Sequence, residues 1–379
     1  MTTRPADGDE PVEVVPFDGD PASWDRFVGT TACATFCHLA GWREIMADVL
    51  GHECVYAVAV TSAGEWAGAL PMVRVRSRLF GDHLVSVPFL NYGGPLGSPA
   101  AERALMHWAF DEARRRGVDG LELRVRHPPG GSAADPLTGM GETAGAEGAH
   151  GAHGAGEPQS RPRKVTVLLD LPETAEALWK DRFPSKLRSQ IRRPQKEGFE
   201  VRFGAEHAPA FYEVFSRNMR DLGTPVLPRA LFDRLPITFP DHVVFGVVYD
   251  GSRPIAGGCG FAWGGEFEMT WASALREYSR QAPNMLLYWA FMEEMIRRGV
   301  KVFNFGRCTP GAGTHRFKLQ WGGTDVPLPW VSWAPGGGAS GVPTPDRPVF
   351  RWATAAWRRL PVPVTNRLGP WLSRQIATF

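Results

Sequence analysis

The sequence has little of what marks a secreted or a metal-binding protein. Its 379 residues hold five cysteines, an odd number scattered along the chain (Cys33, Cys37, Cys54, Cys259 and Cys308). This usage argues against a disulfide framework and favours reduced thiols buried in the core. Cys33 and Cys37 have no second pair of ligands to complete a zinc site, and we expect no metal.

Long apolar runs are also missing. No stretch approaches the ~20 apolar residues that a membrane-spanning helix needs. The start, MTTRPADGDEPVEVV, is acidic and lacks the apolar centre of a signal peptide, so we expect a cytoplasmic protein. The net charge is only +2, from 42 Lys and Arg against 40 Asp and Glu, which argues against a chain built wholly to bind nucleic acid. Any basic site must therefore be local.

What the sequence does contain is an internal repeat. In the first half, HWAF at 107–110 opens an amphipathic run that ends at Gly117 and leads into the strand-like VDGLELR. In the second half, YWAF at 288–291 opens a similar run that ends at Gly299 and leads into VKVFNFGR. A glycine after the last periodic residue is typical of a helix C-cap. Each half therefore predicts a helix followed by a strand, ending at Arg124 or Arg307.

A hairpin pattern precedes the helix in both halves. ECVYAVAV and WAGALPMV flank the turn TSAGE, and HVVFGVVY and IAGGCGFAW flank the turn DGSRP. The order helix, hairpin, further strand, helix, strand is that of an acetyltransferase-like (GNAT) fold. We predict an α/β (α+β) protein with two tandem GNAT-like domains. The alternative is two unrelated α/β segments that share a helix composition.

The composition divides the chain further. Residues 128–163 are rich in Gly and Ala and nearly free of large apolar side chains, so we expect a disordered insertion. The first domain then spans 12–127 and the second 164–334. Residues 335–379 form a Pro/Gly loop and a basic tail, which prolines divide into short helices. The tail either packs onto the second domain or contacts an anionic membrane surface as a peripheral anchor.

Four segments resemble the FemAB family, and the similarity covers most of residues 12–379. They are FPSKLRSQIRRPQKEGFEV, YSRQAPNMLLYWAFMEEMIRRG, VFNFGRCTPGAGTHRFKLQWGG and WRRLPVPVTNRLGPWLSRQI. The branch that the chain most resembles is the FemAB-like proteins associated with exosortase-type envelope systems. The long charged helical hairpin that some members carry is missing here, which puts any tRNA contact by such an arm in doubt.

The resemblance implies two GNAT-like domains that meet at a substrate cleft. It also implies an acyltransferase that moves an aminoacyl group from aminoacyl-tRNA, or another activated acyl group, to an amine of a peptidoglycan or polysaccharide precursor. At the Phe-Lys motif it implies that Lys318 steadies developing charge or a substrate phosphate. No bound cofactor is expected, because the donor is a co-substrate.

A basic cluster lies in residues 180–202. Arg188 and Arg192 are four residues apart and share a helix face, and Lys186 and Arg193 fall close to a shared face as well. Such a cluster suits the phosphates of tRNA or of a nucleotide-linked or polyprenyl-linked substrate. An ordinary solvated helix face explains it equally well. Pro194 is expected to end or kink this helix.

The segment GRCTPGAGTHRFKLQWGG combines glycines with positive charge. Glycines let a ligand approach the backbone closely, and a fixed cation stabilises the oxyanion of acyl transfer. We predict Lys318, Arg307 and His315 as catalytic residues, although a lone histidine is more often structural. A buried thiol is the favoured interpretation of Cys308. Further predicted substrate contacts in these segments are Asn284, Tyr288, Arg316 and Trp321.

In the first half, Asn91 and Tyr92 follow the strand-like HLVSVPFL and precede a Gly-Gly turn. The end of this strand faces the substrate in GNAT-like domains, which makes both residues candidate substrate contacts. Ordinary turn chemistry is an equally good explanation.

Two other functions remain open. A CoA-dependent GNAT N-acyltransferase that modifies a polysaccharide precursor or a small metabolite would need a glycine-rich loop at a helix N-terminus to hold the pyrophosphate. The corresponding loop, SRQAPN, has no glycine, and Pro283 lacks an N–H donor, which favours a donor other than acyl-CoA. A non-catalytic binding protein on the same scaffold is the third alternative, and Lys318 in its glycine-rich setting favours an enzyme over it.

Overall fold

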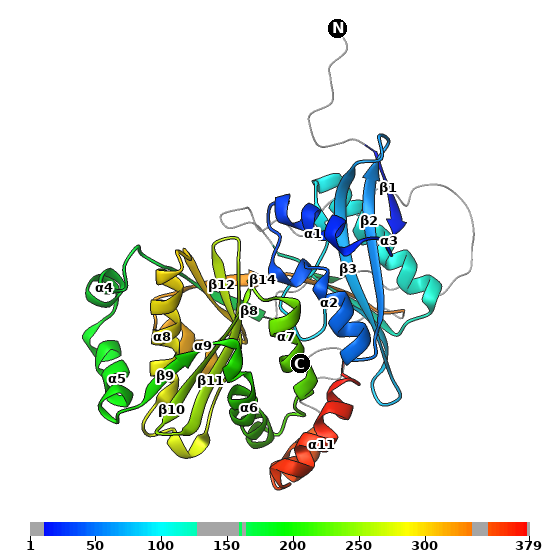
Figure 1. Ribbon diagram of the computed structural model, residues 1–379. Coiled ribbons are helices and arrows are strands. Elements are labelled where there is room, and N and C mark those ends of the chain that lie inside the picture. Colours follow the sequence, from blue (N-terminus) through cyan, green and yellow to red (C-terminus); the bar gives the residue numbers. More distant parts are fainter. Residues whose placement is uncertain (1–10, 127–158, 161–163, 336–347, 377–379) are drawn as a thin grey trace. The chain divides into compact units, whose positions relative to one another are not determined.

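The computed structural model describes residues 11–126, 159–160, 164–335 and 348–376 (Figure 1). These residues form two compact units. The first runs from the start of the described chain to β7 and also includes β15. The second consists of Lys164–Pro327 together with the C-terminal helices.

The first unit contains eight strands and their covering helices. Its elements are β1 (Val12–Pro16), α1 (Pro21–Thr30), η1 (Phe36–His38), α2 (Gly41–Glu44), η2 (Ile45–Val49), β2 (Glu53–Thr61), β3 (Trp66–Ser77), β4 (Gly81–Ser86), β5 (Leu96–Gly97), α3 (Pro99–Arg116), β6 (Gly120–Arg124), β7 (Gln159–Ser160) and β15 (Trp330–Trp333). The sheet order is β1-β2-β3-β4-β6-β15-β7, with β5 beside β3. Among the described strands of this sheet, β4 and β6 alone pair in parallel.

The second unit repeats this arrangement. Its elements are β8 (Lys164–Asp170), α4 (Ala175–Ala177), η3 (Leu178–Arg182), α5 (Ser185–Lys196), β9 (Glu200–Phe203), η4 (Ala205–His207), α6 (Ala208–Leu222), α7 (Arg229–Thr238), β10 (Val243–Asp250), β11 (Arg253–Trp263), β12 (Glu266–Ala274), η5 (Arg276–Tyr278), α8 (Pro283–Arg297), β13 (Val302–Cys308), α9 (Gly313–Leu319), β14 (Thr324–Leu328), α10 (Pro348–Trp357) and α11 (Val362–Ser373). The sheet order is β14-β8-β13-β12-β11-β10-β9. Here β12 and β13 pair in parallel.

The predicted fold class and the internal repeat are therefore confirmed. In each unit an antiparallel hairpin is followed by a third strand, a crossover helix and a strand that pairs in parallel with the third. The crossover helix is α3 in the first unit and α8 in the second. Gly117 ends α3 in the left-handed region at φ 61°, and Gly299 follows α8 at φ 79°. This conformation costs glycine little, which is why both runs stop there.

The two units differ from the predicted boundaries at their last strands. The second domain was expected to run to residue 334, but β15 pairs antiparallel with β6 and so completes the first sheet. It takes the place that β8 takes beside β13 in the second sheet. The predicted insertion at 128–163 lies outside the described residues except for Gln159 and Ser160, which pair with β15 as β7.

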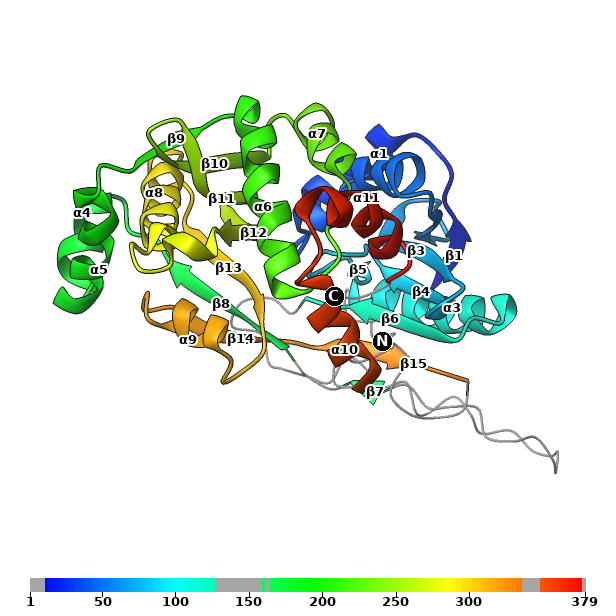
Figure 2. The same cartoon turned by 90° about the horizontal axis from the view of Figure 1, so that it is seen from below.

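Two helices cover opposite faces of the second sheet, as Figure 2 shows for α6 and α8. Successive residues of a strand point to opposite faces. A Cβ at Gly257 would lie 3.1 Å from Phe211 of α6, and one at Gly258 would lie 2.9 Å from Phe291 of α8. The consecutive glycines of β11 therefore let both helices lie close to the sheet.

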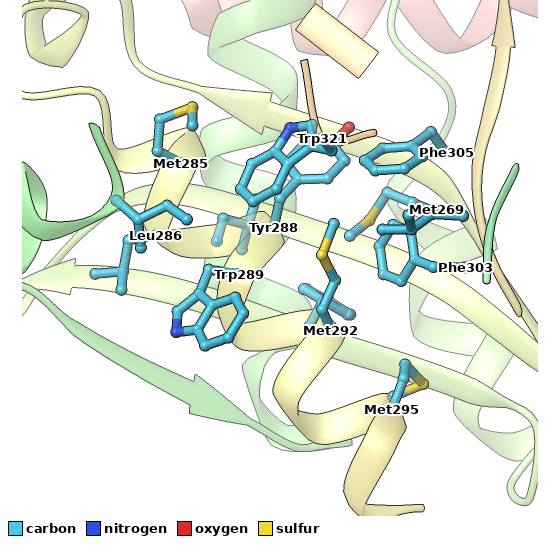
Figure 3. Close-up of a cluster of buried hydrophobic side chains, with 14 of the residues drawn as sticks. Met269, Met285, Leu286, Tyr288, Trp289, Met292, Met295, Phe303, Phe305 and Trp321 are labelled. Carbon is cyan, nitrogen blue, oxygen red and sulfur yellow. The ribbon is translucent and has the colours of Figure 1, made fainter. Parts of the chain in front are cut away.

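The core beneath α8 is rich in aromatic and methionine side chains (Figure 3). It includes Met269, Met285, Met292, Met295, Phe303, Phe305 and Trp321, all at most 4% exposed. Methionine is unbranched and fills irregular gaps between flat rings. This core fixes the position of β13 and α9, the two elements that carry the candidate site.

Two local expectations for helix ends change. Pro194 does not end α5, which continues to Lys196. A proline in the last turn removes only one late hydrogen bond, so the helix tolerates it there. In the tail, Pro361 lies at the expected break, directly before α11, but Pro363 lies in the first turn of that helix and Pro370 inside it.

Candidate functional site

The site is built on an irregularity in β13. The register of β13 against β8 shifts between Asn304 and Arg307, and Gly306 between them has φ 72°. Asn304 is fully buried, and its Oδ1 accepts hydrogen bonds from the Gly306 amide at 2.8 Å and from the Thr166 hydroxyl. The bulge is therefore fixed from inside, and it turns the carbonyls of Gly306 and Arg307 out of the regular ladder.

Two carboxylates complete this network. The Asn304 amide nitrogen donates to Glu266 at 2.8 Å and to Glu268 at 3.4 Å. Glu268 is only 1% exposed. Sequence reasoning missed both carboxylates and Asn304. In VFNFG and EFEMTW these polar residues alternate with apolar ones, a pattern that predicts a solvent-facing side, so the sequence carried no signal of their burial.

Lys318 of α9 points its ammonium group at the bulge. Nζ donates to the Gly306 carbonyl at 2.6 Å and to the Arg307 carbonyl at 3.0 Å. The residue is 7% exposed. A lysine that is buried this far almost always has a specific purpose, because removing an ammonium from water is costly.

Burial lowers the pKa of Lys318 to about 8, against the opposing influence of nearby Cys308 and Glu268. Burial also raises the pKa of the Cys308 thiol, whose Sγ lies 3.7 Å from the Val165 carbonyl. A raised pKa makes a thiolate scarce at neutral pH, so Cys308 is an inert buried thiol and not a nucleophile. The ammonium of Lys318 is the chemically distinctive group here.

His315 serves the loop that precedes α9. Its Nδ1 accepts a hydrogen bond from the Gly311 amide at 3.0 Å, which places the ring proton on Nε2. Nε2 lies 2.9 Å from both carboxylate oxygens of Asp325 on β14. Both ring nitrogens are thus engaged within the protein, and this geometry gives His315 a positioning role instead of the predicted one as a base.

Arg316 holds the same loop from the other side. Its guanidinium donates to the Gly311 carbonyl at 2.6 Å. His315 and Arg316 therefore fix the amide and the carbonyl of a single residue. Arg307 is half-buried on β13, where its carbonyl serves Lys318.

Tyr288 and Trp321, predicted as substrate contacts, lie in the core (Figure 3). The Tyr288 ring stacks on Phe305 with 5.7 Å between centroids, and Trp321 lies 6.1 Å from Tyr288. Trp321 is 1% exposed. These rings support α9 and β13 from below, so they position Lys318 and do not themselves reach a ligand in this conformation.

The basic cluster divides into two parts. Arg188 donates to the carbonyls of Trp179, Lys180 and Phe183 at 3.1–3.3 Å, which caps η3 at its C-terminal end. Arg192 lies over the Trp179 ring at 5.2 Å and is exposed, as is Lys186. Arg188 therefore has a structural function, whereas Arg192 and Lys186 present charge to solvent.

The basic helix and Lys318 belong to one packed body. Phe183, at the start of α5, contacts Trp289 of α8 and Trp321, which follows α9, with centroids 5.6 Å apart in both pairs. Trp179 also packs on Trp289 at 5.0 Å. The position of the exposed cations on α5 is thus fixed relative to the Lys318 site.

The N-terminus of α8 has an unusual cap. Ala282 adopts the left-handed conformation at φ 55° and makes no side-chain cap hydrogen bond, and Pro283 follows it. A residue with a Cβ is strained there by about 1–2 kcal/mol. Asn284 is the second residue of the helix and is half-buried. The loop SRQAPN contains no glycine, but Ala282 adopts the left-handed backbone conformation that glycine usually supplies.

In the first unit, the parallel strands β4 and β6 end in a different set of contacts. Arg124 at the end of β6 is fully buried, and its guanidinium donates to the Val87 carbonyl at 3.2 Å and also to the Leu90 carbonyl. Its carbonyl accepts the Gly94 amide at 3.0 Å. The loop after β4 is therefore pinned against β6, and it includes the buried residues Asn91 and Tyr92. Arg126 lies 5.2 Å from the Tyr92 ring.

Among the described residues, no helix is long and apolar enough to cross a membrane. No group of three His, Cys, Asp or Glu side chains in the same part of the chain is placed to hold a metal ion. Cys37, Cys259 and Cys308 are buried as predicted, whereas Cys33 and Cys54 are half-buried.

Comparisons with known proteins agree with this description. Residues 182–319 match the family model described as an acetyltransferase (GNAT) domain. Among the curated proteins, none matches the sequence. Three solved structures share the fold at low identity. FemX has a TM-score of 0.61 at 14% identity, over 85% of this chain and 98% of that one.

A tandem GNAT protein from the clavulanic acid biosynthesis pathway has a TM-score of 0.51 at 14% identity, over 86% of this chain and all of that one (100%). The C-terminal domain of a protein from Agrobacterium fabrum, named as a lysylphosphatidylglycerol synthetase, has a TM-score of 0.51 at 12% identity, over 77% and 86%. The chain therefore contains an acetyltransferase (GNAT) domain at residues 182–319, and its two repeated sheets share the fold of these neighbours, which include a tandem GNAT protein.

Proposed function

We propose that the protein transfers an aminoacyl group from aminoacyl-tRNA, or another activated acyl group, to an amine of a cell-envelope precursor. The observation that carries this proposal is the buried ammonium of Lys318, held by the two carbonyls of the β13 bulge. Two of its three N–H bonds are used by these acceptors within the described residues. The third is available to an oxygen of the substrate.

The chemistry follows from that placement. The acceptor amine forms a C–N bond to the donor carbonyl, the bond to the carrier oxygen or sulfur breaks, and the amine proton passes to the leaving group. Negative charge builds on the carbonyl oxygen in between. A fixed cation in a water-poor site stabilises this charge without reorganisation, and it does so equally for charge on a substrate phosphate.

The donor is proposed from the exposed cations of α5. Lys186, Arg192, Arg193 and Lys196 are all exposed and lie on a helix that packs against α8. Such a surface fits a carrier with many phosphates, because phosphate contacts dominate the affinity of nucleic-acid binding. An acyl-CoA donor is the second candidate, favoured by the match of residues 182–319 to the GNAT acetyltransferase domain.

The acceptor is proposed from the relatives. One structural neighbour is named as a lysylphosphatidylglycerol synthetase, and its name describes a product in which lysine is attached to a phospholipid. The FemAB-type resemblance implies an envelope precursor with a free amine. Asn91 and Tyr92 of the first unit, Asn284 of the second and the predicted catalytic Arg307 stay candidates for contacts with this substrate.

Transfer assays with two donor classes test the proposal. Purified protein is given charged tRNA in one series and acyl-CoA in the other, each with amine-bearing envelope precursors. We expect product with charged tRNA that is lost in Lys318→Met and kept in Lys301→Met, which changes an exposed lysine directly before β13. Product with acyl-CoA alone would identify the second candidate, and product that does not depend on Lys318 would contradict the assigned role.

A further inference from the structure

The C-terminal helix α11 packs its small and polar face against the protein and exposes its apolar face, the reverse of an ordinary surface helix. The residues that it buries are small or polar, namely Thr365, Gly369 and Ser373, at intervals of four. The residues that it exposes are large and apolar. Val364 is 39% exposed, Leu368 45% and Trp371 58%. Positions 364, 368 and 371 share one helix face, so the apolar stripe is continuous.

The packing of α11 keeps this stripe turned outward. A Cβ at Gly369 would lie 2.9 Å from the Val226 backbone nitrogen, so only glycine fits at this contact. Asn366 donates to Ser216 of α6 at 3.4 Å. Rotating the helix to bury Leu368 or Trp371 would force a large side chain against Val226. The exposure is therefore a consequence of the fold.

The rest of the tail is firmly attached to the second unit. Arg220 of α6 donates to the Leu360 carbonyl at 3.1 Å, and Arg358, directly after α10, donates to the Leu222 carbonyl at 3.0 Å. A Cβ at Gly223 would lie 2.3 Å from Thr354 of α10. The expectation that the tail packs onto the second domain is met by these contacts, but they cover only its polar side.

Charge on the tail has a single sign. From residue 348 to 379 the sequence contains five arginines and no Asp or Glu. Arg367 of α11, one turn before Trp371, and Arg374, the residue that directly follows the helix, are both exposed. Trp352 of α10, at 80%, is the most exposed large hydrophobic residue of the described chain. Apolar and tryptophan side chains beside arginines, without carboxylates, match the headgroup region of an anionic bilayer.

We infer that the outward face of α11, made of Val364, Leu368, Trp371, Arg367 and Arg374, docks the protein on anionic phospholipid. Leu368 and Trp371 enter the acyl boundary, and the arginines pair with headgroup phosphates. Each arginine near such a surface contributes roughly a fivefold gain in partitioning. This inference depends only on the geometry of the tail, and it holds or fails without reference to the reaction proposed above.

Vesicle co-sedimentation of the full chain tests the inference without substrates. We expect the wild type to bind vesicles of phosphatidylcholine mixed with phosphatidylglycerol and to bind phosphatidylcholine alone far more weakly. The triple variant Val364→Ser, Leu368→Ser, Trp371→Ser should lose binding. Ile237→Ser is the matched control, because Ile237 is 70% exposed on α7, outside the stripe, and its loss should change nothing.

The arginine pair is tested separately. Arg367→Gln with Arg374→Gln should weaken binding to the anionic vesicles roughly twentyfold or more, and added salt should weaken wild-type binding in the same direction. Equal binding by the wild type and the triple variant would overturn the inference. So would sedimentation equilibrium that shows wild-type dimers, lost in the triple variant, together with no vesicle binding, because the stripe would then join two copies of the chain.

Discussion

The ammonium nitrogen of Lys318 lies 2.6 Å from the carbonyl oxygen of Gly306, which faces it because of the bulge in β13. A regular strand would commit that carbonyl to the ladder with β8. The left-handed Gly306 and the buried Asn304 side chain redirect it instead. The candidate catalytic cation is thus held by backbone geometry, and its contribution to the reaction can be separated from its contribution to stability.

Replacing Lys318 by Met should lower kcat about 10²–10³-fold, because one preorganised donor at the oxyanion or phosphate is lost. The measurement is the transfer rate under saturating donor and acceptor. Lys301→Met removes an exposed lysine and should leave the rate unchanged. A near-wild-type kcat for Lys318→Met would show that the lysine is not catalytic.

The activity should depend on pH through the same residue. The pKa of Lys318 is lowered to about 8, so its ammonium form, which the mechanism requires, is present below pH 8 and disappears as the pH rises through it. A plot of log kcat against pH should therefore fall with an apparent pKa near 8. In Lys318→Arg the guanidinium stays charged, and any activity that remains should not show this fall.

Protein stability should change with pH in the opposite direction. The pKa of Lys318 is lower in the folded protein than its ordinary value of 10.5, so the unfolded chain binds more protons between these values. The free energy of unfolding should rise from about pH 8 to about pH 10.5, by on the order of 3 kcal/mol from this residue. In urea melts, the free energy of unfolding of the wild type should rise by this amount relative to that of Lys318→Met across this window. Parallel curves would contradict the lowered pKa.

His315→Ala should act mainly on stability. It removes the hydrogen bonds to Gly311 and Asp325 and should cost about 1–3 kcal/mol. Asp325→Asn should give part of the same loss, because the carboxylate is the partner of Nε2. A general base would behave differently, with a loss of 10²-fold or more in kcat and an unchanged melting temperature. Thermal melts and kinetics on both variants distinguish the two roles.

Arg188 and Arg192 should differ although they lie one turn apart. Arg188→Ala leaves three carbonyls of η3 and its end without their donor and should lower the free energy of unfolding by about 1–3 kcal/mol. Arg192→Ala, combined with Lys186→Ala, should leave stability nearly unchanged and raise KM for a phosphate-rich donor, more strongly at low salt. Arg229→Ala on α7 is the control for removal of an exposed cation elsewhere. Equal effects of both changes on KM would mean that Arg188 also contacts the donor.

The sequence by itself determined the repeat. The apolar periodicity, the glycines at 117 and 299 and the paired hairpin patterns are local signals, and local signals define helices and strands. The same reading found the segment that carries Lys318, because glycines beside a conspicuous cluster of cations are visible without a structure. It also found α5, although not the residue at which the helix ends.

Only the tertiary structure decided what each cation does. Whether an arginine caps a helix or faces a ligand depends on carbonyls that are brought to it by folding, as Arg188 and Arg192 show. His315 pairs with Asp325 of the next element along the chain, and β15 joins the first sheet although it lies in the second half of the sequence. Sequence periodicity carries no information on such contacts, because it records which face of an element is apolar and not which neighbour covers it. For the same reason the sequence left two alternatives open for the tail, packing on the second domain or contact with a membrane, and the packing of Gly369 against Val226 was needed to show that the apolar stripe of α11 faces outward.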